Sequence, residues 1–436
     1  MDIYNFVSFS GIFVLIGFAW LLSADRRNMN WRVIGWGLAL QGLIAVFVFV
    51  LPVGSQAFLF INDLVVKLLD SAAAGTRFLF GRLALPPGAT GPAGETSLGF
   101  FLAFQALPPI VFFSAFMGVL YFYNLLPRLI RVFASVFTRL MRVSGAESVC
   151  VSSNIFVGIE SCLTIRPYLQ RMTPSELCTV LTSGMATVAS SVLAFYVFTL
   201  KARFPGIAGH LISASLLSAP AALIMSKILL PESNIPETLG ESIELHYEKE
   251  DNLFEAIIKG ANAGVKLIVG IAALLLAMLG LMALVDLFLG GAGGSINSWL
   301  GLHIDWTLKG LLGYLFYPFT LVLGIPPSDA WTVSKIIGER AVLTEVASYR
   351  DLAVVMGKHL LHHPRSAVIT TYALCGFAHL ASMSIFVGGV AALAPNQTPT
   401  LSRIAFRALV AATLACLLTA CVAGVFFTKA SLLLGG

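Results

Sequence analysis

Long stretches without a charged residue recur along the whole chain, and this feature constrains the fold more than any other. A helix that crosses a bilayer needs about 20 apolar residues. Charged residues make up 11% of the 436 residues, against roughly 25% in soluble globular proteins. The sequence therefore predicts an all-α polytopic membrane protein and excludes a soluble enzyme. Eight transmembrane helices are expected: Tyr4–Ser23, Val33–Asn62, Thr96–Pro127, Leu177–Leu200, Phe204–Ser226, Leu267–Val285, Ser366–Ser402 and Ala408–Thr428.

The basic residues of the connecting segments predict the orientation, because cytoplasmic loops carry an excess of Lys and Arg. The loops after the first and third spans are both basic, so both are expected in the cytoplasm and both termini outside. The acidic connection 232–251 then lies inside as a mobile segment, and the net charge of +5 indicates topology and no nucleic-acid partner. The basic residues used are Arg26, Arg27, Arg32, Arg128, Arg131, Arg139 and Arg142, with Arg403 and Arg407 inside before the last helix.

The segment after the second span is expected to lie along the membrane interface. The run Val33–Asn62 is too long for one span and carries Pro52 and Gly54. Residues Gln56–Gly81 then mix apolar residues with Lys67, Asp70 and Arg77 at helical spacing, which favours an interfacial helix. A Pro/Gly-rich loop, residues 85–94, comes next. Six cysteines lie in or beside apolar stretches without a metal-ligand spacing, and we interpret them as packing residues: Cys150, Cys162, Cys178, Cys375, Cys416 and Cys421.

Two semi-apolar stretches do not fit a simple count of spans. Residues Ser144–Met172 and Gly310–Tyr349 are interrupted by Gly and Pro and carry acidic residues, so they are predicted to be re-entrant hairpins of opposite orientation. Each precedes a span with a weak, polar or small-residue centre, at 183–191 and 375–384. Inverted repeats with broken helices that meet near the midplane are typical of secondary transporters, because exposed backbone at membrane depth persists only where it lines a cavity.

Two carboxylates at membrane depth are candidate ligands, because an ionised group in hydrocarbon must face a polar partner or cavity. Glu160 lies in the first hairpin, and a salt bridge to Arg166 is the alternative role. Glu345 lies in the second hairpin, where Arg340 or Arg350 could pair with it instead.

The broken centre of the seventh span supplies further polar candidates. His379 and Ser382 stand three residues apart and are expected on one helix face, with Phe377 on the same turn. A satisfied core histidine is the alternative for His379. Glu147 is interpreted as an interfacial partner of the basic residues Arg139 and Arg142.

Several runs in unbroken order resemble the concentrative nucleoside transporter family in its short bacterial form, over roughly residues 30–428. These are Leu107–Tyr121, Ser144–Ser148 leading into Asn154–Gly158, Arg166–Leu169, Ser175–Leu177, Thr344–Tyr349, Ala373–Ala378 and Gly388–Pro395. The resemblance implies an inner-membrane symporter that imports nucleosides, assembles as a homotrimer and moves its transport domain as an elevator.

The same resemblance implies a division of the chain. Residues 1–127 and 230–292 would form scaffold helices, with the cytoplasmic connection in the latter. Residues 128–229 and 293–436 would be the two transport-domain repeats.

The resemblance also assigns site residues. Substrate-binding positions are Gly158, Ile159, Glu160, Glu345, Phe377, His379 and Ser382, and a sodium site would use Asn154, Val157, Thr187 and Val188. Ile159 and one missing residue stand where the family has Gln and Thr, and His379 stands where it usually has Asn. Loss of the base-reading amide predicts broad selectivity. The four residues of the expected sodium site offer side-chain and backbone oxygen atoms, which are the ligands that a hard cation prefers.

Other readings remain open at this point. Protons could drive transport instead of sodium, with Glu160 or His379 as the titrating group, and the cargo could be a nucleobase or another polar heterocycle. An integral-membrane transferase would need a polar cluster at a membrane face, for which the candidates are Asp351, His359, His362 and His363. A channel would not explain two opposed hairpins. We expect no enzymatic activity and no cofactor besides the coupling ion.

Overall fold

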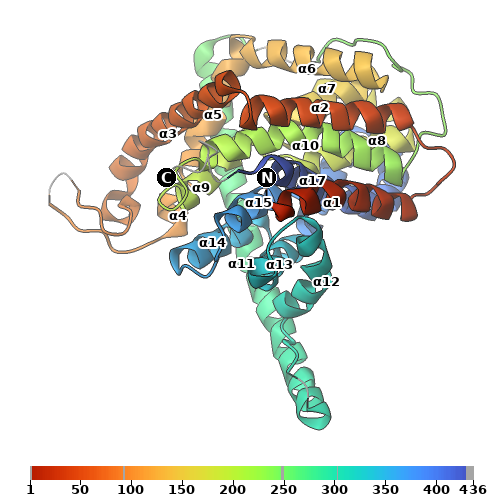
Figure 1. Ribbon diagram of the computed structural model, residues 1–436. Helices are drawn as coiled ribbons and strands as arrows, with labels where there is room; N and C mark the ends of the chain where they lie inside the picture. The colour runs from red at the N-terminus through yellow and green to blue at the C-terminus, as the bar shows by residue number, and fades with distance from the viewer. Residues whose placement is uncertain (1, 92–93, 247–249, 302, 429–436) are drawn as a thin grey trace.

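The computed structural model describes residues 2–91, 94–246, 250–301 and 303–428, and its regular elements are helical (Figure 1). The N-terminal elements are α1 (Ile3–Leu21), α2 (Trp31–Phe49), α3 (Pro52–Phe80), η1 (Gly81–Ala84), α4 (Leu102–Gln105), α5 (Pro109–Phe122) and α6 (Leu125–Met141). The central elements are α7 (Gly145–Asn154), η2 (Ile159–Ile165), η3 (Leu169–Arg171), α8 (Pro174–Ala186), α9 (Ser190–Leu200), α10 (Ile207–Leu229) and α11 (Leu253–Leu300). The C-terminal elements are α12 (Leu308–Val322), α13 (Pro327–Val342), α14 (Glu345–Gly357), α15 (Pro364–Leu374), α16 (Leu380–Leu393), η4 (Pro395–Gln397) and α17 (Thr398–Phe426).

Seven helical segments in the described ranges are long and apolar enough to cross a membrane, where the sequence predicted eight spans. The expected span Ser366–Ser402 is divided between α15, α16 and the start of α17. The prediction that Arg403 and Arg407 lie in a loop before the last helix is wrong, because α17 already begins at Thr398. Pro399 fits the first turn of that helix, where its missing N–H costs nothing. The guanidinium of Arg407 donates to the carbonyl of Leu229 at the end of α10.

The predicted interfacial helix corresponds to α3. Pro52 occupies its first turn, so the run that was too long for one span is divided between α2, which ends at Phe49, and α3. The loop expected at residues 85–94 is irregular where it is described, and residues 92–93 lie outside the described part. All six cysteines are buried free thiols, as packing residues are.

The helices form a buried group and a more exposed group. Helices α8, α10 and α17 pack on one another and are mostly buried, and α1 packs along α17. Helix α11 packs mainly on α5 and is mostly exposed. Its 48 residues span about 72 Å at 1.5 Å per residue, and its far end extends beyond the other helices in Figure 1.

Small residues allow α5 and α11 to approach closely. A Cβ added to Gly260 would lie 2.7 Å from the Cα of Ala115, and one added to Gly264 would lie 2.7 Å from the Cα of Val111. With Ala256, these glycines repeat every four residues on one face of α11, which is the small-residue packing pattern of membrane helices. The two helices therefore form a close pair.

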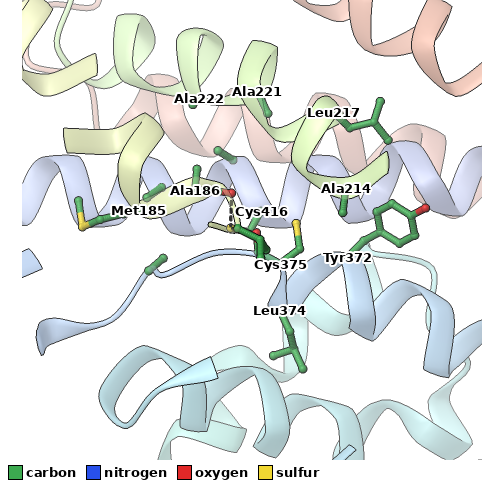
Figure 2. Packing of buried hydrophobic residues seen from close by; sticks show 14 of the residues in the cluster. Met185, Ala186, Ala214, Leu217, Ala221, Ala222, Tyr372, Leu374, Cys375 and Cys416 are labelled. Atoms are coloured by element: carbon green, nitrogen blue, oxygen red, sulfur yellow. Dashed lines mark hydrogen bonds between the residues drawn. The ribbon is translucent and has the colours of Figure 1, made fainter. Parts of the chain in front are cut away.

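Two helices are interrupted, and their interruptions meet. The first separates α8 from α9 at residues 187–189, and the second separates α15 from α16 at residues 375–379. The thiol of Cys416 on α17 lies between them, 3.7 Å from the carbonyl oxygen of Ala186 and 3.8 Å from that of Cys375 (Figure 2). A Cβ on Gly376 would lie 2.9 Å from the carbonyl oxygen of Met185, so this approach requires a glycine.

The second hairpin lies further along the chain than the sequence suggested. Helix α12 is a separate element, and the turn at residues 343–344 joins α13 to α14, so these two helices are the arms. Lys309 on α12 forms ion pairs with Glu339 on α13, at 2.7 Å, and with Asp351 on α14. Lys309 thereby connects the two arms, α13 and α14, to each other.

The first hairpin is formed by α7 and the turns η2 and η3, and the acidic connection packs along it. The amide of His246 donates to the carbonyl of Thr164, and the amide of Gly145 donates to that of Thr238. The connection is therefore hydrogen-bonded to the hairpin where it is described, contrary to the expectation of a mobile segment, and residues 247–249 lie outside the described part.

Glu147 does not have the partners that the sequence suggested. Its carboxylate caps the start of α7 and lies 2.5 Å from the ammonium of Lys227 on α10. The ion pair is buried, so Glu147 connects the start of the first hairpin to the end of α10.

Candidate functional site

A cavity of about 540 Å³ lies between the α5–α11 pair and the first hairpin. Its volume is within the range of small-molecule sites. Met117 and Tyr121 line it from α5, Lys259 lines it from α11, and Gly158 and Glu160 line it from the hairpin. The carboxylate of Glu160 accepts the amide N–H of Gly158 at 3.1 Å. Two of the predicted substrate-binding residues therefore face an open cavity.

Ile159, the residue between them, has a different environment. Its side chain packs toward α16, where a Cβ added to Gly389 would lie 2.2 Å from Ile159 Cδ1. It is not among the residues that line the cavity. Ile159 thus packs between the first hairpin and α16.

Glu345 belongs to a second, buried group. It is the first residue of α14, after the N-cap Thr344, and is 1% exposed. The hydroxyl of Tyr196 on α9 donates to Oε1 at 2.6 Å, and Nε2 of His379 lies 3.2 Å from Oε2. Arg340, a suggested alternative partner, instead donates to the carbonyl of Ala373.

His379 and Ser382 do not project from one helix face as predicted. His379 is the N-cap of α16 and has an extended backbone, with φ −143° and ψ 166°. Its Nδ1 accepts the amide N–H of Ser382 at 3.2 Å, and its own amide donates to the hydroxyl of Ser382, also at 3.2 Å. That hydroxyl donates to backbone carbonyls of Phe377 and His379. The two residues therefore cap the start of α16, where the first backbone N–H groups have no hydrogen-bond partner within the helix.

Phe377 stands at the edge of this buried group. It is half-buried, and its ring centroid lies 5.6 Å from that of His379. Glu345, Phe377, His379 and Ser382 do not line the cavity beside Glu160. The structure thus brings the predicted substrate residues together in two groups, one open and one buried.

The residues of the expected sodium site meet where the first hairpin reaches the α8–α9 break. The amide of Asn154 donates to the hydroxyl of Ser183 at 3.0 Å, and the hydroxyl of Thr187 donates to the carbonyl of Ser183 at 2.9 Å. The carbonyl of Phe156 accepts the amide of Ser190. Among the described residues, Oδ1 of Asn154 is buried and has no hydrogen-bond partner. A buried oxygen of this kind suits a hard cation.

Val157 and Val188 flank the same place. Val188 follows Thr187 in the break and is buried, whereas Val157 is half-buried and lines the cavity. Each valine offers a backbone carbonyl. The structure therefore places all four expected ligands around one junction.

Sequence reasoning missed Tyr196, and it placed Ser183 in the polar centre 183–191 without assigning it a contact. A tyrosine or serine inside an apolar span carries no pattern that marks it as functional, so only their tertiary contacts identify them. The histidine cluster offered for a membrane enzyme does not assemble: the amides of His362 and His363 bind Asp329, and Asp351 pairs with Lys309. Within the described residues, no three His, Cys, Asp or Glu side chains are grouped to hold a metal ion.

Comparison with known proteins places the chain in a family. The model described as "Na+ dependent nucleoside transporter C-terminus" matches residues 210–424, the corresponding N-terminus model matches 10–83, and one described as "Nucleoside recognition" matches 103–203. Solute carrier family 28 member 3 of Mus musculus is 34% identical, over 97% of this chain and 59% of its own length. The chain thus spans about three fifths of that curated relative.

A bacterial relative and a solved structure match over nearly their whole lengths. An uncharacterized transporter of Haemophilus influenzae is 34% identical, over 96% of this chain and 97% of its own. CNTnw in an inward-facing substrate-bound state superposes with a TM-score of 0.86 at 33% identity, covering 97% of this chain and 98% of that one. This all-helical, multi-span membrane protein therefore belongs to the concentrative nucleoside transporter family.

Proposed function

We propose that this chain is a secondary active symporter that imports nucleosides across the cytoplasmic membrane and is driven by a sodium gradient. The observation that carries the proposal is the junction of the two broken helices, with buried oxygen atoms on the side of the first hairpin and a buried carboxylate at the turn of the second. Exposed backbone and ionised groups at membrane depth are typical of transporter sites. The family's sodium dependence supports the choice of ion.

The proposed movement is an elevator between two groups of helices. The order α6, first hairpin (α7, η2 and η3), α8, α9, α10 parallels the order α12, second hairpin (α13 and α14), α15, α16, α17, which supports two repeats. The two repeats would have opposite orientations in the membrane. Helices α3, α5 and α11 form the proposed scaffold, and the cavity lies where the first hairpin faces it. A moving hairpin could then carry substrate past α5 and α11.

Helices α1 and α2 belong to the moving group in this proposal, which changes the boundary expected at residue 127. The guanidinium of Arg365 on α15 donates to the hydroxyl of Ser8 at 2.6 Å and to the side-chain oxygen of Asn5 at 3.0 Å. Gln41 on α2 donates to the carbonyl of Leu217 on α10. Buried bonds of this kind favour rigid attachment of both helices to the repeats.

Substrate recognition is divided between the two groups of residues. Glu345 would accept hydroxyl protons of the sugar, because charge-assisted hydrogen bonds to a dry carboxylate contribute about 1.5–3 kcal/mol each. Phe377 would contact the apolar faces of the substrate, and Glu160, beside Gly158 in the open cavity, would meet the base. Neither Ile159 nor Ser382 offers a free polar group to the substrate. Ile159 would act by packing against α16, and Ser382 would act by capping the start of α16.

The sodium ion would be held at the hairpin junction. Asn154 and Thr187 supply side-chain oxygens, and Val157 and Val188 supply carbonyls. Bound there, the ion would neutralise the carbonyl end of α8 and fix the first hairpin against the break. That coupling makes substrate binding depend on sodium.

Assembly and orientation follow the family expectation. The apolar surface of α11 away from α5 is exposed, with Leu276, Leu287 and Phe288 more than two thirds exposed, which is consistent with contacts to lipid and to two further copies in a homotrimer. Both termini would lie outside the cytoplasmic membrane.

Radiolabelled uptake into proteoliposomes tests the function. Sodium and pH gradients are imposed separately at a fixed membrane potential. We expect uridine uptake with the sodium gradient alone, and loss of uptake in Glu345→Gln with normal expression and assembly. Uptake that follows only the pH gradient would refute sodium coupling, and wild-type uptake in Glu345→Gln would refute the role of the carboxylate.

A further inference from the structure

One serine contacts both side chains of the proposed sodium site. Ser183 lies in the last turn of α8, just before the break at residues 187–189, and its side chain is buried. Its hydroxyl accepts the side-chain amide N–H of Asn154 at 3.0 Å, and its backbone carbonyl accepts the hydroxyl of Thr187 at 2.9 Å. Ser183 therefore contacts the two side chains through two different groups.

The single hydrogen of the Ser183 hydroxyl is used elsewhere. This hydroxyl donates to the carbonyl of Val180 at 3.1 Å, and a hydroxyl has one hydrogen and two lone pairs. Toward Asn154 it can therefore only accept. The end of the Asn154 amide that faces it must be the nitrogen, because an oxygen there would set two acceptors against each other.

A thiol makes the same selection for the second hydrogen of the amide. Sγ of Cys150, one turn before Asn154 on α7, lies 3.6 Å from the amide nitrogen. The thiol donates its own hydrogen to the hydroxyl of Ser161 at 3.7 Å, so it too presents only lone pairs to the amide. Sulfur is a weak acceptor, so Ser183 is the stronger of the two partners.

These contacts leave oxygen lone pairs for a cation. Both hydrogens of the Asn154 amide are directed to Ser183 and Cys150, and among the described residues Oδ1 is buried without a hydrogen-bond partner. The hydroxyl hydrogen of Thr187 is likewise directed to the carbonyl of Ser183. A hard cation is held by oxygen atoms that present lone pairs and no hydrogen.

We infer that Ser183 and Cys150 are positioning residues that set the sodium affinity by fixing which end of the Asn154 amide faces the cation. Neither acts as a ligand. Half a turn of the amide would bring its NH₂ group to the ion and its oxygen to two atoms whose hydrogens are used elsewhere. The inference rests on the proposed sodium coupling and adds two residues to the four expected ligands.

Sodium binding to the purified protein tests the inference without transport. The full-length protein in lipid nanodiscs is heated at increasing concentrations of sodium chloride, with choline chloride added to keep the ionic strength constant. A ligand of the folded state raises the unfolding midpoint with its concentration, and this dependence gives its dissociation constant. We expect Ser183→Ala to raise the sodium dissociation constant about fivefold, and Cys150→Ala about threefold.

Ser226→Ala is the matched control. Ser226 on α10 is buried, donates to the carbonyl of Leu223 three residues earlier, and shares a hydrogen bond of 2.9 Å with Thr179 on α8. The control thus removes the same kind of hydroxyl from a contact that includes none of the four expected ligands. Its sodium dissociation constant should stay within about twofold of the wild-type value. A fivefold rise in the control would overturn the inference, because the loss would not be specific to Ser183.

Two double variants show through which ligand Ser183 acts. In the Asn154→Ala background the serine has no amide to orient, so adding Ser183→Ala should change the sodium dissociation constant less than about twofold. In the Thr187→Ala background the two effects should multiply, because Ser183→Ala keeps the backbone carbonyl that Thr187 contacts. Effects that multiply in both backgrounds would show that Ser183 does not act through Asn154 and would overturn its role.

An unchanged sodium dissociation constant in Ser183→Ala or in Cys150→Ala would overturn the role of that residue. If Ser183→Ala does not assemble, Ser183→Cys replaces it. Its weaker acceptor should raise the constant about threefold, and an unchanged constant would again overturn the role.

The binding assay also separates the inference from the proposed function. Sodium that stabilises a protein unable to take up any nucleoside would refute the proposed function and leave the inference standing. Sodium-driven uptake together with an unchanged constant in Ser183→Ala would do the reverse. A wild-type protein that sodium stabilises no more than choline would overturn both the sodium site and the inference.

Discussion

Removing the ammonium of Lys227 should destabilise the protein severely, because it would leave buried carboxylates unpaired. The side chain is 5% exposed and lies 2.5 Å from Glu147, which is 1% exposed, and 3.4 Å from Glu232. It also donates to the hydroxyl of Ser175 at 3.0 Å. Breaking a buried ion pair costs about 3–5 kcal/mol, so Lys227→Met should lower the free energy of unfolding by that amount.

The assay is thermal unfolding of the purified full-length protein in detergent, followed by the loss of the monodisperse chromatographic peak. At about 2 °C per kcal/mol for a large chain, the midpoint should fall by roughly 6–10 °C. A matched control is Lys201→Met, because the Lys201–Asp70 pair is 3.1 Å long but has side chains 33% and 64% exposed. Exposed pairs contribute about 0–1 kcal/mol, so the control midpoint should hardly move.

A second substitution tests the reason for the loss. Adding Glu147→Gln to Lys227→Met removes the unpaired charge, so the double variant should be more stable than Lys227→Met alone. Equal midpoints for Lys227→Met and Lys201→Met, or a double variant less stable than either single one, would refute the argument that the uncompensated buried charge causes the loss.

Three further predictions concern coupling, packing and selectivity. Thr187→Ala should raise the sodium concentration that gives half-maximal uptake by about tenfold while leaving the KM for uridine at saturating sodium within about twofold; the reverse pattern would contradict the ion site. Gly264→Leu should separate α5 from α11 and reduce the amount of assembled protein, whereas Gly270→Leu, which meets no atom within 4 Å, should not; equal yields would contradict the close-packing argument. If Ile159 replaces the base-reading amide that the family resemblance implies, inhibition constants of adenosine, cytidine, thymidine and inosine against uridine uptake should agree within about tenfold, and Glu160→Ala should weaken all four together; a hundredfold preference for one base class would contradict broad selectivity.

The amino-acid sequence was sufficient for the fold class and for the positions of the broken helices. Uncharged stretches of spanning length predict membrane helices from hydrophobicity alone, and the weak centres at 183–191 and 375–384 contain both observed interruptions. Helix ends were less certain, since Pro52 and Pro399 lie in the first turns of helices that begin inside uncharged stretches. The sequence placed the second hairpin too early in the chain. Gly and Pro residues mark where helices are interrupted, but they do not show which two helices pack against each other as the arms of a hairpin.

Partner choice was decided by the tertiary structure. The sequence placed Glu345 near Arg340 and Arg350 because they are neighbours along the chain, yet folding brings Tyr196, 149 residues away, to its carboxylate. Glu147 likewise pairs with Lys227, a residue of another helix. A buried charged side chain pairs with a group that helix packing places next to it, and the separation of two residues along the chain does not show whether they become neighbours.

Composition and periodicity thus determined that this chain crosses the membrane and where its helices break, because both depend on the local balance of apolar, small and polar residues. The contacts of Glu345, the cap formed by His379, and the packing of α1 on α17 and of α2 on α10 depend on helices far apart in sequence. Only the tertiary structure could decide them, since hydrogen bonds act over about 3 Å and require atoms that packing has already brought together.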